Sequence, residues 1–230
     1  MLSRVKVLST FSKVAGDGGR QSPVAISRRR PNRQVRLRAP SRRQPQYHPK
    51  PSIFDRRSTM LETKDLILRK AKFEDWEPMY CNVWSRPESF RYMMLEPSPS
   101  AEEAQERMRR TIAFQAERET AYTIFQKSTG EAMGFGGIAR LEGDTWEETG
   151  ICLGPDFWGR GYGTQVLNCL LGHAWKLGAR EFVYSAWEEN AASRALAAKA
   201  GFRQYAIERH TRPRDGYEYT LIKHKRALSA

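Results

Sequence analysis

The stretch GICLGPDFWGRGYGTQ, residues 150–165, decides the fold of this chain. It joins an apolar strand, through a glycine-rich turn, to an apolar-striped helix expected from about Tyr162 to Leu177. Glycines let the backbone come close to a ligand, and the first amides of a helix have no partner within it. The helix dipole adds about half a positive charge at this end, which suits an anion such as a pyrophosphate. The stretch therefore predicts an anion site, although the glycines could serve only as a tight connection.

The turn matches neither of the two common nucleotide-binding fingerprints. It lacks the Gly-Lys-Ser/Thr ending of a P-loop, and Gly161 is followed by Tyr162-Gly163-Thr164-Gln165-Val166, without the third glycine of the dinucleotide fold. The pyrophosphate of an acyl-coenzyme A is the better candidate ligand. Arg160 could add a charge-assisted contact to it.

The pattern around this turn predicts one α+β domain over residues 61–230. Strands are expected at 65–69, 121–125, 133–138, 148–153, 181–187, 202–208 and 216–223. Helices are expected through Trp76 and Tyr80, from the capping box at Ser100 to about Glu117, at 162–177 and at 191–200. The order βααβββαβαββ indicates a sheet layered with helices.

A second segment, ENAASRALAAKAGF at residues 189–202, joins a strand to a helix that ends in Gly-Phe. Asn190 suits an N-cap and Gly201 the position just after a helix, and these roles need no function. The two segments in this order resemble the GNAT superfamily of N-acetyltransferases, and in particular its ribosomal-protein N-terminal (RimJ/RimL-like) branch. The resemblance covers about Leu61 to Lys225.

The motifs of that family can be matched residue by residue. Its coenzyme A loop, Q/R-x-x-G-x-G/A, corresponds to Gly161 and Gly163, with Trp158 where Gln or Arg is usual. The pattern N-x-x-S before K-x-G-F is matched by Asn190, Ser193, Lys199, Gly201 and Phe202. The resemblance implies a GNAT-like mixed, mostly antiparallel central sheet flanked by helices, with a splayed strand pair at the acetyl-CoA site.

The resemblance also implies an activity. The chain would be an N-acetyltransferase that moves acetyl from acetyl-CoA to a primary amine, a protein N-terminus or a small molecule, by direct attack in a ternary complex. The expected coenzyme-binding residues are Ile151, Cys152, Leu153, Trp158, Gly159, Arg160, Gly161, Tyr162, Gly163, Thr164, Asn190 and Ser193.

Two residues are candidates for the catalytic proton chemistry. Relatives commonly place a glutamate where Glu148 stands, two residues before Gly150, and it would act as the base directly or through a water; otherwise it is one acid of an exposed pair. Many members protonate the thiolate with a tyrosine at the position of Ala197, so Ser193 is the substitute donor, or simply a first-turn helix residue. Cys152 is expected to be a buried spectator rather than a nucleophile.

The acceptor would approach over the opposite face, where Trp84 and Tyr92 are the expected substrate-wall residues. Three cysteines without CxxC spacing and four scattered histidines favour neither a disulfide framework nor a metal site, and no apolar run suits a membrane helix. A metal-free cytoplasmic protein, a monomer or homodimer, is expected.

Residues 1–60 carry the whole net charge of the chain. They hold 15 of the 39 Lys and Arg but only two of the 26 Asp and Glu, so residues 61–230 hold 24 of each. This Pro-, Arg- and Ser-rich segment is expected to be disordered. It could be an extension upstream of a natural start at Met60, a transit peptide, or an arm that binds nucleic acid weakly. The alternative functions are therefore a silent acyl-CoA-binding domain and a nucleic-acid-binding protein.

Overall fold

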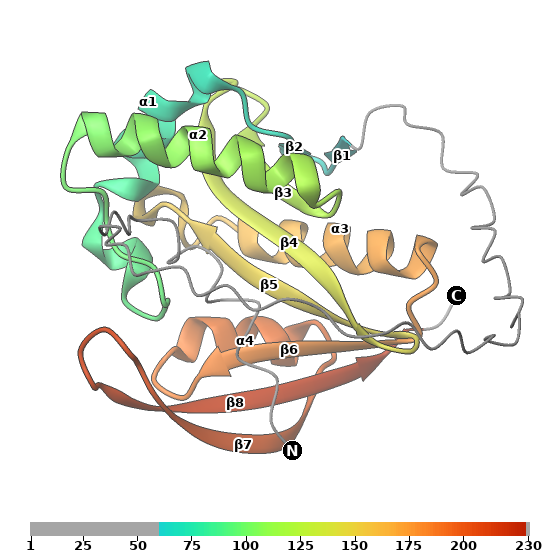
Figure 1. Cartoon of the computed structure of the whole chain (residues 1–230). Coiled ribbons are helices and arrows are strands. Elements are labelled where there is room, and N and C mark those ends of the chain that lie inside the picture. The colour runs from blue at the N-terminus through green and yellow to red at the C-terminus, as the bar shows by residue number, and fades with distance from the viewer. Residues whose placement is uncertain (1–59, 229–230) are drawn as a thin grey trace, which may run out of the picture. The chain divides into compact units, whose positions relative to one another are not determined.

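The computed structural model describes residues 60–228. Residues 1–59 of the basic segment lie outside the described residues, so the structure does not test the three interpretations of that segment. Within the described part, eight strands form one sheet in the order β1-β2-β3-β4-β5-β6-β8-β7 (Figure 1). The strands are β1 (Leu61–Glu62), β2 (Leu66–Arg69), β3 (Ala121–Gln126), β4 (Ala132–Glu142), β5 (Thr145–Leu153), β6 (Glu181–Trp187), β7 (Arg203–Thr211) and β8 (Glu218–Ala227).

The helices largely follow the sequence prediction. Those of regular length are α2 (Ala101–Glu117), α3 (Tyr162–Lys176) and α4 (Ala191–Lys199). Ser100 accepts a hydrogen bond from the amide of Glu103, and Asn190 accepts one from the amide of Ser193, so both predicted N-caps are confirmed. The helix predicted through Trp76 and Tyr80 is present as the consecutive helical turns η2 (Phe73–Asp75), α1 (Trp76–Met79) and the π-helical η3 (Tyr80–Trp84), and a separate turn, η4 (Pro87–Phe90), follows it.

Apolar residues cover both faces of the sheet. One cluster packs α3 and α4 against the sheet and includes Leu66, Tyr122, Leu167, Phe182 and Phe202. The other packs α2 and the turns of residues 73–90 against the opposite face and includes Met79, Phe90, Met108, Phe125 and Cys152. Side chains alternate between the faces of a strand, and here both faces are buried. The result is a three-layer α+β domain, as the sequence predicted.

The pairing of β5 with β6 positions the site, because it is the parallel pair in an otherwise antiparallel sheet. Its register runs over three pairs and ends at Glu147 and Val183. Beyond that point β5 stays on β4 as far as Leu153, while β6 follows β8 as far as Trp187. The two strands therefore diverge over their C-terminal halves, and this is the predicted splayed pair.

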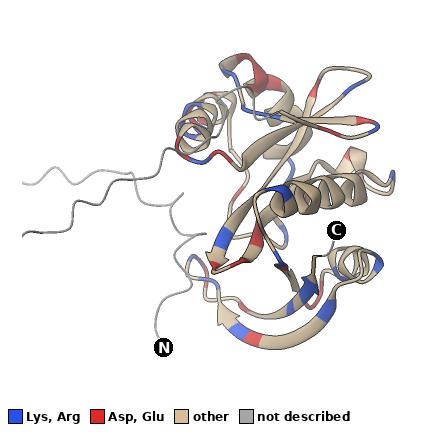
Figure 2. Ribbon diagram, turned by 90° about the vertical axis from the view of Figure 1, so that its right-hand side faces the viewer, with Lys and Arg blue, Asp and Glu red and all other residues tan. Residues whose placement is uncertain are grey.

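The charges of the described domain are mixed in sign. Basic and acidic residues are interspersed over the ribbon (Figure 2), and the β7–β8 hairpin of residues 203–227 holds seven basic and three acidic residues. This distribution agrees with the balanced count for residues 61–230. The described domain therefore has no general excess of positive charge for a polyanion.

Candidate functional site

The glycine-rich turn lies between β5 and α3. Gly159 and Gly161 have φ angles of +71° and +79°, in the left-handed region that glycine adopts without strain. A Cβ atom added at either position would meet nothing within 4 Å, so the turn faces open space. Gly161 is the N-cap of α3 and makes no side-chain cap, so the first amides of a 15-residue helix point into that space.

Two residues of the turn fold back on the protein. The Trp158 indole donates a hydrogen bond of 2.7 Å to the carbonyl of Leu153, at the end of β5, while 52% of the residue stays exposed. The Arg160 guanidinium lies 6.0 Å from the centre of the Phe157 ring. Gly163, the second residue of α3, brings the helix close to α4, since a Cβ there would lie 3.5 Å from Leu196. The start of α3 and the middle of α4 are therefore neighbours.

Glu148 lies where β5 and β6 separate. Its carboxylate accepts hydrogen bonds from the backbone amides of Gly150, on its own strand, and Ser185, on β6. Burial raises the pKa of Glu148 to about 7, against the opposing effect of the two amides, and the nearby charge of Glu147 raises it further. A part-buried carboxyl with this pKa can take up and release a proton near neutral pH, which is the property of a general base.

A second pair of polar groups lies on the helix side of β6. The Tyr184 hydroxyl is 2.8 Å from Oγ of Ser193, in the first turn of α4. The Tyr184 residue is 4% exposed, and burial, followed by the charge of Glu148, raises the pKa of its phenol above the usual range. The splay thus carries an acid-base group on β5 and a hydroxyl pair between β6 and α4.

Aromatic rings gather at the C-terminal end of β6. The rings of Trp187 and Tyr219 stack with centroids 4.0 Å apart, and Tyr217 stacks on Trp187 at 6.0 Å. Tyr92 meets Trp187 edge-on at 6.0 Å. The Arg212 guanidinium lies over Trp187 and Tyr217, and it also pairs with Asp215. We call Tyr92, Trp187, Tyr217 and Tyr219 the aromatic wall.

The loop of residues 91–97 and the turn of residues 212–217 meet at the aromatic wall. Arg214, in the turn, donates a 2.9 Å hydrogen bond to the carbonyl of Leu95 and lies 3.5 Å from the Glu96 carboxylate. The part-buried Arg107 of α2 donates to the Glu96 carbonyl at 2.8 Å. A Cβ at Gly150 would lie 3.4 Å from the terminal methyl of Met93, so this loop also covers the bend in β5.

The family model described as Acetyltransferase (GNAT) domain matches residues 65–203, which is more than half of the chain. The chain belongs to the GNAT acetyltransferase family. This membership confirms the resemblance that the loop and the N-x-x-S segment indicated, and it makes the chain an acyltransferase whose donor is acetyl-CoA.

Individual GNAT proteins agree with this assignment. An uncharacterized N-acetyltransferase, p20, of Bacillus licheniformis is 26% identical over 178 residues, which cover 73% of this chain and 98% of that protein. A GNAT acetyltransferase structure from Bacillus anthracis superimposes with a TM-score of 0.63 at 16% identity, over 73% of this chain and 98% of the other. A Salmonella typhimurium acetyltransferase that modifies the N-terminal serine of ribosomal protein L7/L12 gives 0.61 at 21% identity, over 74% and 99%.

Most of the site residues expected from the sequence lie around the splay of β5 and β6 and the starts of α3 and α4. They are the residues of the turn, the end of β5, Glu148, Asn190 and Ser193. Cys152 reaches it only through its backbone, because its thiol points into the core, 3.5 Å from the Ser89 carbonyl. Burial raises the pKa of the Cys152 thiol to about 12, so the thiol is protonated at neutral pH.

The predicted position of Trp84 was wrong. The prediction placed it on the acceptor wall, but only 3% of the residue is exposed, and its ring packs in the second core beneath the Arg107 guanidinium, 5.4 Å away. Trp84 is the last residue of the π-helical turn of residues 80–84 and is buried there with Val83. Tyr92 does lie on the aromatic wall.

Sequence reasoning missed Tyr184, and of the aromatic wall it missed Trp187, Tyr217 and Tyr219. Trp187 ends β6, Tyr219 lies in β8, and Tyr217 lies in the turn just before β8. β6 and β8 are distant in sequence and adjacent in the sheet. The strand expected at 216–223 contains two tyrosines spaced two apart, which would place their rings on one face, and this was an available signal. Their partner could be recognised only once β6 and β8 were known to pair.

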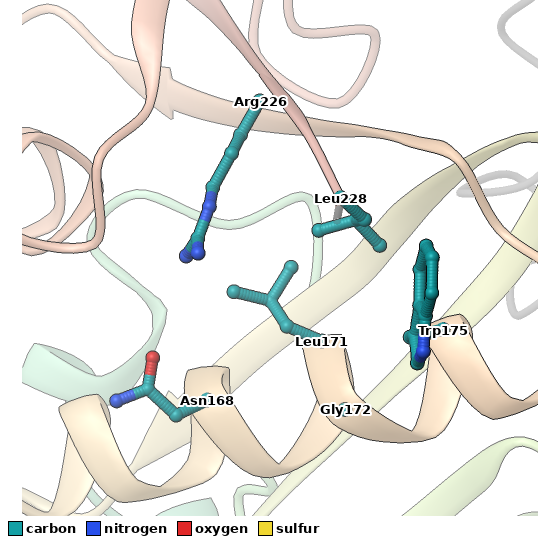
Figure 3. A pocket seen from close by; sticks show the side chains of 6 residues that line it. All are labelled: Asn168, Leu171, Gly172, Trp175, Arg226 and Leu228. Atoms are coloured by element: carbon teal, nitrogen blue, oxygen red, sulfur yellow. The ribbon is translucent and has the colours of Figure 1, made fainter. Parts of the chain in front are cut away.

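A shallow groove lies on α3, away from these groups. Its volume is about 230 Å³, and it is lined by Asn168, Leu171, Gly172, Trp175, Arg226 and Leu228 (Figure 3). The Arg226 side chain extends over it and donates 2.7 Å to the carbonyl of Ala200. Neither the turn glycines nor Glu148 nor Ser193 lines it.

Among residues 60–228, no group of three His, Cys, Asp or Glu side chains is placed to hold a metal ion. None of the helices described is both long and apolar enough to cross a membrane.

Proposed function

We propose that the chain transfers an acetyl group from acetyl-CoA to a primary amine, a protein N-terminus or a small-molecule amine, by direct attack in a ternary complex. The observation that carries this proposal is Glu148, a carboxyl with a pKa of about 7 at the point where β5 and β6 separate. A base with that pKa is matched to an attacking amine near neutral pH.

On the donor side, the amides of the turn and of the first turn of α3 bind the pyrophosphate, helped by the helix dipole and Arg160. The backbone of Ile151, Cys152 and Leu153, on the edge of β5 that β6 leaves free, holds the pantetheine arm and polarises the thioester carbonyl. Trp158, Gly159, Tyr162, Gly163, Thr164 and Asn190 complete the coenzyme contacts.

On the acceptor side, Glu148 takes the proton that the amine loses as its nitrogen bonds to the acetyl carbon. The C–S bond then breaks, and the sulfur leaves with the electron pair. The Ser193 hydroxyl stabilises this thiolate by donating a hydrogen bond, because Ala197 leaves the usual tyrosine position without a donor. Losing one such donor typically costs about 10²- to 10³-fold in rate.

The acceptor binds between the loop of residues 91–97 and the turn of residues 212–217, against the aromatic wall. A peptide N-terminus is the first acceptor to test, because the Salmonella typhimurium neighbour modifies an N-terminal serine. The mixed charge of this mouth, with Arg212 and Arg214 beside Glu96 and Asp215, does not demand a strongly charged acceptor.

The test is calorimetric titration of the full chain with acetyl-CoA, followed by thiol release with peptides that begin in Ser or Ala and with small primary amines. We expect micromolar binding that Gly161→Glu abolishes, because its carboxylate would occupy the anion site, and turnover with at least one amine. A chain that binds no acetyl-CoA would contradict the proposal.

Ala197 stands where many family members have the tyrosine that protonates the thiolate. The alternative function is therefore a catalytically silent domain that only binds acyl-CoA. Binding without turnover of any amine would favour it. Nucleic-acid binding through residues 1–60 is a separate alternative, and it predicts salt-sensitive affinity that deletion of residues 1–59 removes.

A further inference from the structure

Tyr184 and Ser193, whose hydroxyl groups form a pair, differ in solvent exposure. Tyr184 is 4% exposed and is enclosed in the core with Phe202, whose ring centre is 5.7 Å away. Ser193 is part-exposed in the first turn of α4, and its amide is already bonded to Asn190. Only Ser193 can therefore touch a ligand that enters the splay.

The chemistry of the two groups sets the direction of their hydrogen bond. A phenol is a much stronger acid than an aliphatic alcohol, so Tyr184 is the better donor and Ser193 the better acceptor. With Oγ accepting from Tyr184, the proton of Ser193 is left to point elsewhere. Hydrogen bonds in such a chain polarise one another, so the Ser193 hydroxyl becomes a stronger donor.

Ala197 has no hydroxyl group, although it stands where many family members have a tyrosine. It is 0% exposed and belongs to the same core cluster as Tyr184 and Phe202. The phenol that this chain offers next to α4 therefore comes from strand β6. Because it is buried, it reaches the site only through Ser193.

We propose that Tyr184 is a positioning residue for thiolate departure, which holds the Ser193 hydroxyl with its proton directed at the sulfur of acetyl-CoA. This inference rests on the proposed function. The proton balance is unchanged by it: the amine proton goes to Glu148 and then to solvent, the sulfur leaves with the C–S electron pair, and both hydroxyls keep their protons. Burial, which raises the pKa of Tyr184, also keeps its phenol protonated.

The test is a double-mutant cycle on the full chain with Tyr184→Phe and Ser193→Ala. Tyr184→Phe removes one oxygen and keeps the ring on Phe202. We expect it to lower kcat about 5- to 10-fold with the KM for acetyl-CoA unchanged, as for the loss of one hydrogen bond. Ser193→Ala should lower kcat further, and adding Tyr184→Phe to it should change nothing more.

Tyr122→Phe is the matched control. The Tyr122 hydroxyl is also buried and also ties a strand to a helix, through a 3.1 Å contact with His173 of α3. It lies outside the proposed machinery, so its loss should lower the melting temperature as Tyr184→Phe does and leave kcat as in the wild type. Ser193→Thr keeps a hydroxyl and should keep the sensitivity to Tyr184→Phe.

The outcomes separate this inference from the proposed function. Wild-type turnover with an unaltered kcat in Tyr184→Phe, or kcat losses that multiply in the double variant, would overturn the role of Tyr184 alone. A wild-type chain that turns over no amine would overturn the proposed function and this inference with it.

Discussion

The carboxylate of Glu148 accepts a hydrogen bond from the backbone amide of Gly150, two residues further along the same strand. Gly150 has a φ angle of +110°, and the register of β5 on β4 shifts at this point. The bend that turns β5 away from β6 therefore also positions the acid. Strand distortions of this kind commonly aim a side chain next to an active site.

The first prediction concerns the pH dependence of turnover. Glu148 acts as a base only when ionised, so kcat should rise with pH through about 7 and then level off. Glu148→Gln should lower kcat about 10²- to 10⁴-fold and remove this limb, which leaves only the ionisation of the amine. Glu147→Gln, at the adjacent acid, should keep most of the activity. A Glu148→Gln variant with wild-type kcat would assign the base elsewhere.

The second prediction concerns the pH dependence of stability. The raised pKa of Glu148 should lower stability over the same pH range in which it raises kcat. The folded pKa of Glu148 lies above the ordinary value of 4.5, so the folded state binds the proton more tightly. Its contribution to stability is full below pH 4.5 and is lost as the pH rises through about 7. Glu148→Gln should therefore raise the free energy of unfolding at pH 8 by about 1–3 kcal/mol, and by little at pH 4. Denaturant unfolding at both pH values measures this difference, and equal effects at the two would contradict the raised pKa.

The third prediction isolates the role of the turn. Gly161→Ala and Gly130→Ala each place a side chain at a similar φ, +79° and +75°, with open space around the new Cβ. Both should cost about 1–2 kcal/mol of stability from backbone strain. Only Gly161→Ala should also weaken acetyl-CoA binding in calorimetry, because Gly130 lies in the β3–β4 turn. Equal affinities for the two variants would make Gly161 purely structural.

Much of the fold could be predicted because its signals are local. The caps at Ser100 and Asn190 and the glycine turn before α3 are each set within a few residues. The predicted helix through Trp76 and Tyr80 is present, but it is not a regular α-helix. Its segment contains Pro78 and Pro87, which remove backbone donors, and it folds as successive 3₁₀, α and π turns.

The site was predictable only on its donor side, since that side is one continuous stretch of sequence. β5 begins at Thr145, three residues before the predicted start, because residues 145–147 pair with both β4 and β6. The Tyr184–Ser193 pair and the aromatic wall likewise depend on which strands become neighbours. No periodicity within β6 or β8 encodes that pairing.

The fourth prediction concerns Cys152. Its buried thiol, with a pKa raised to about 12, cannot serve as a nucleophile at neutral pH. Cys152→Ala should keep kcat within about twofold and lower stability by about 1 kcal/mol through the small cavity it leaves. Intact-protein mass spectrometry after mixing the wild type with acetyl-CoA should find no acetyl adduct at this residue. An adduct on Cys152 that transfers to amine would replace direct attack with a two-step mechanism.

The last prediction concerns the contact that joins the two sides of the acceptor mouth. Arg214 bonds to the Leu95 carbonyl and pairs with Glu96, so Arg214→Ala frees the loop of residues 91–97 from the turn of residues 212–217. We expect the KM for the acceptor to rise about 5- to 20-fold, as for one charge-assisted hydrogen bond, while the affinity for acetyl-CoA stays unchanged.

Arg209→Ala, at an exposed arginine of β7 in the same hairpin, is the control and should leave both constants unchanged. Steady-state kinetics with varied acceptor, beside calorimetry with acetyl-CoA, separates the two sides of the site. If Arg214→Ala weakened acetyl-CoA binding and left the acceptor KM alone, the mouth formed by these two segments would belong to the donor. The amine would then have to enter from the other side of the splay.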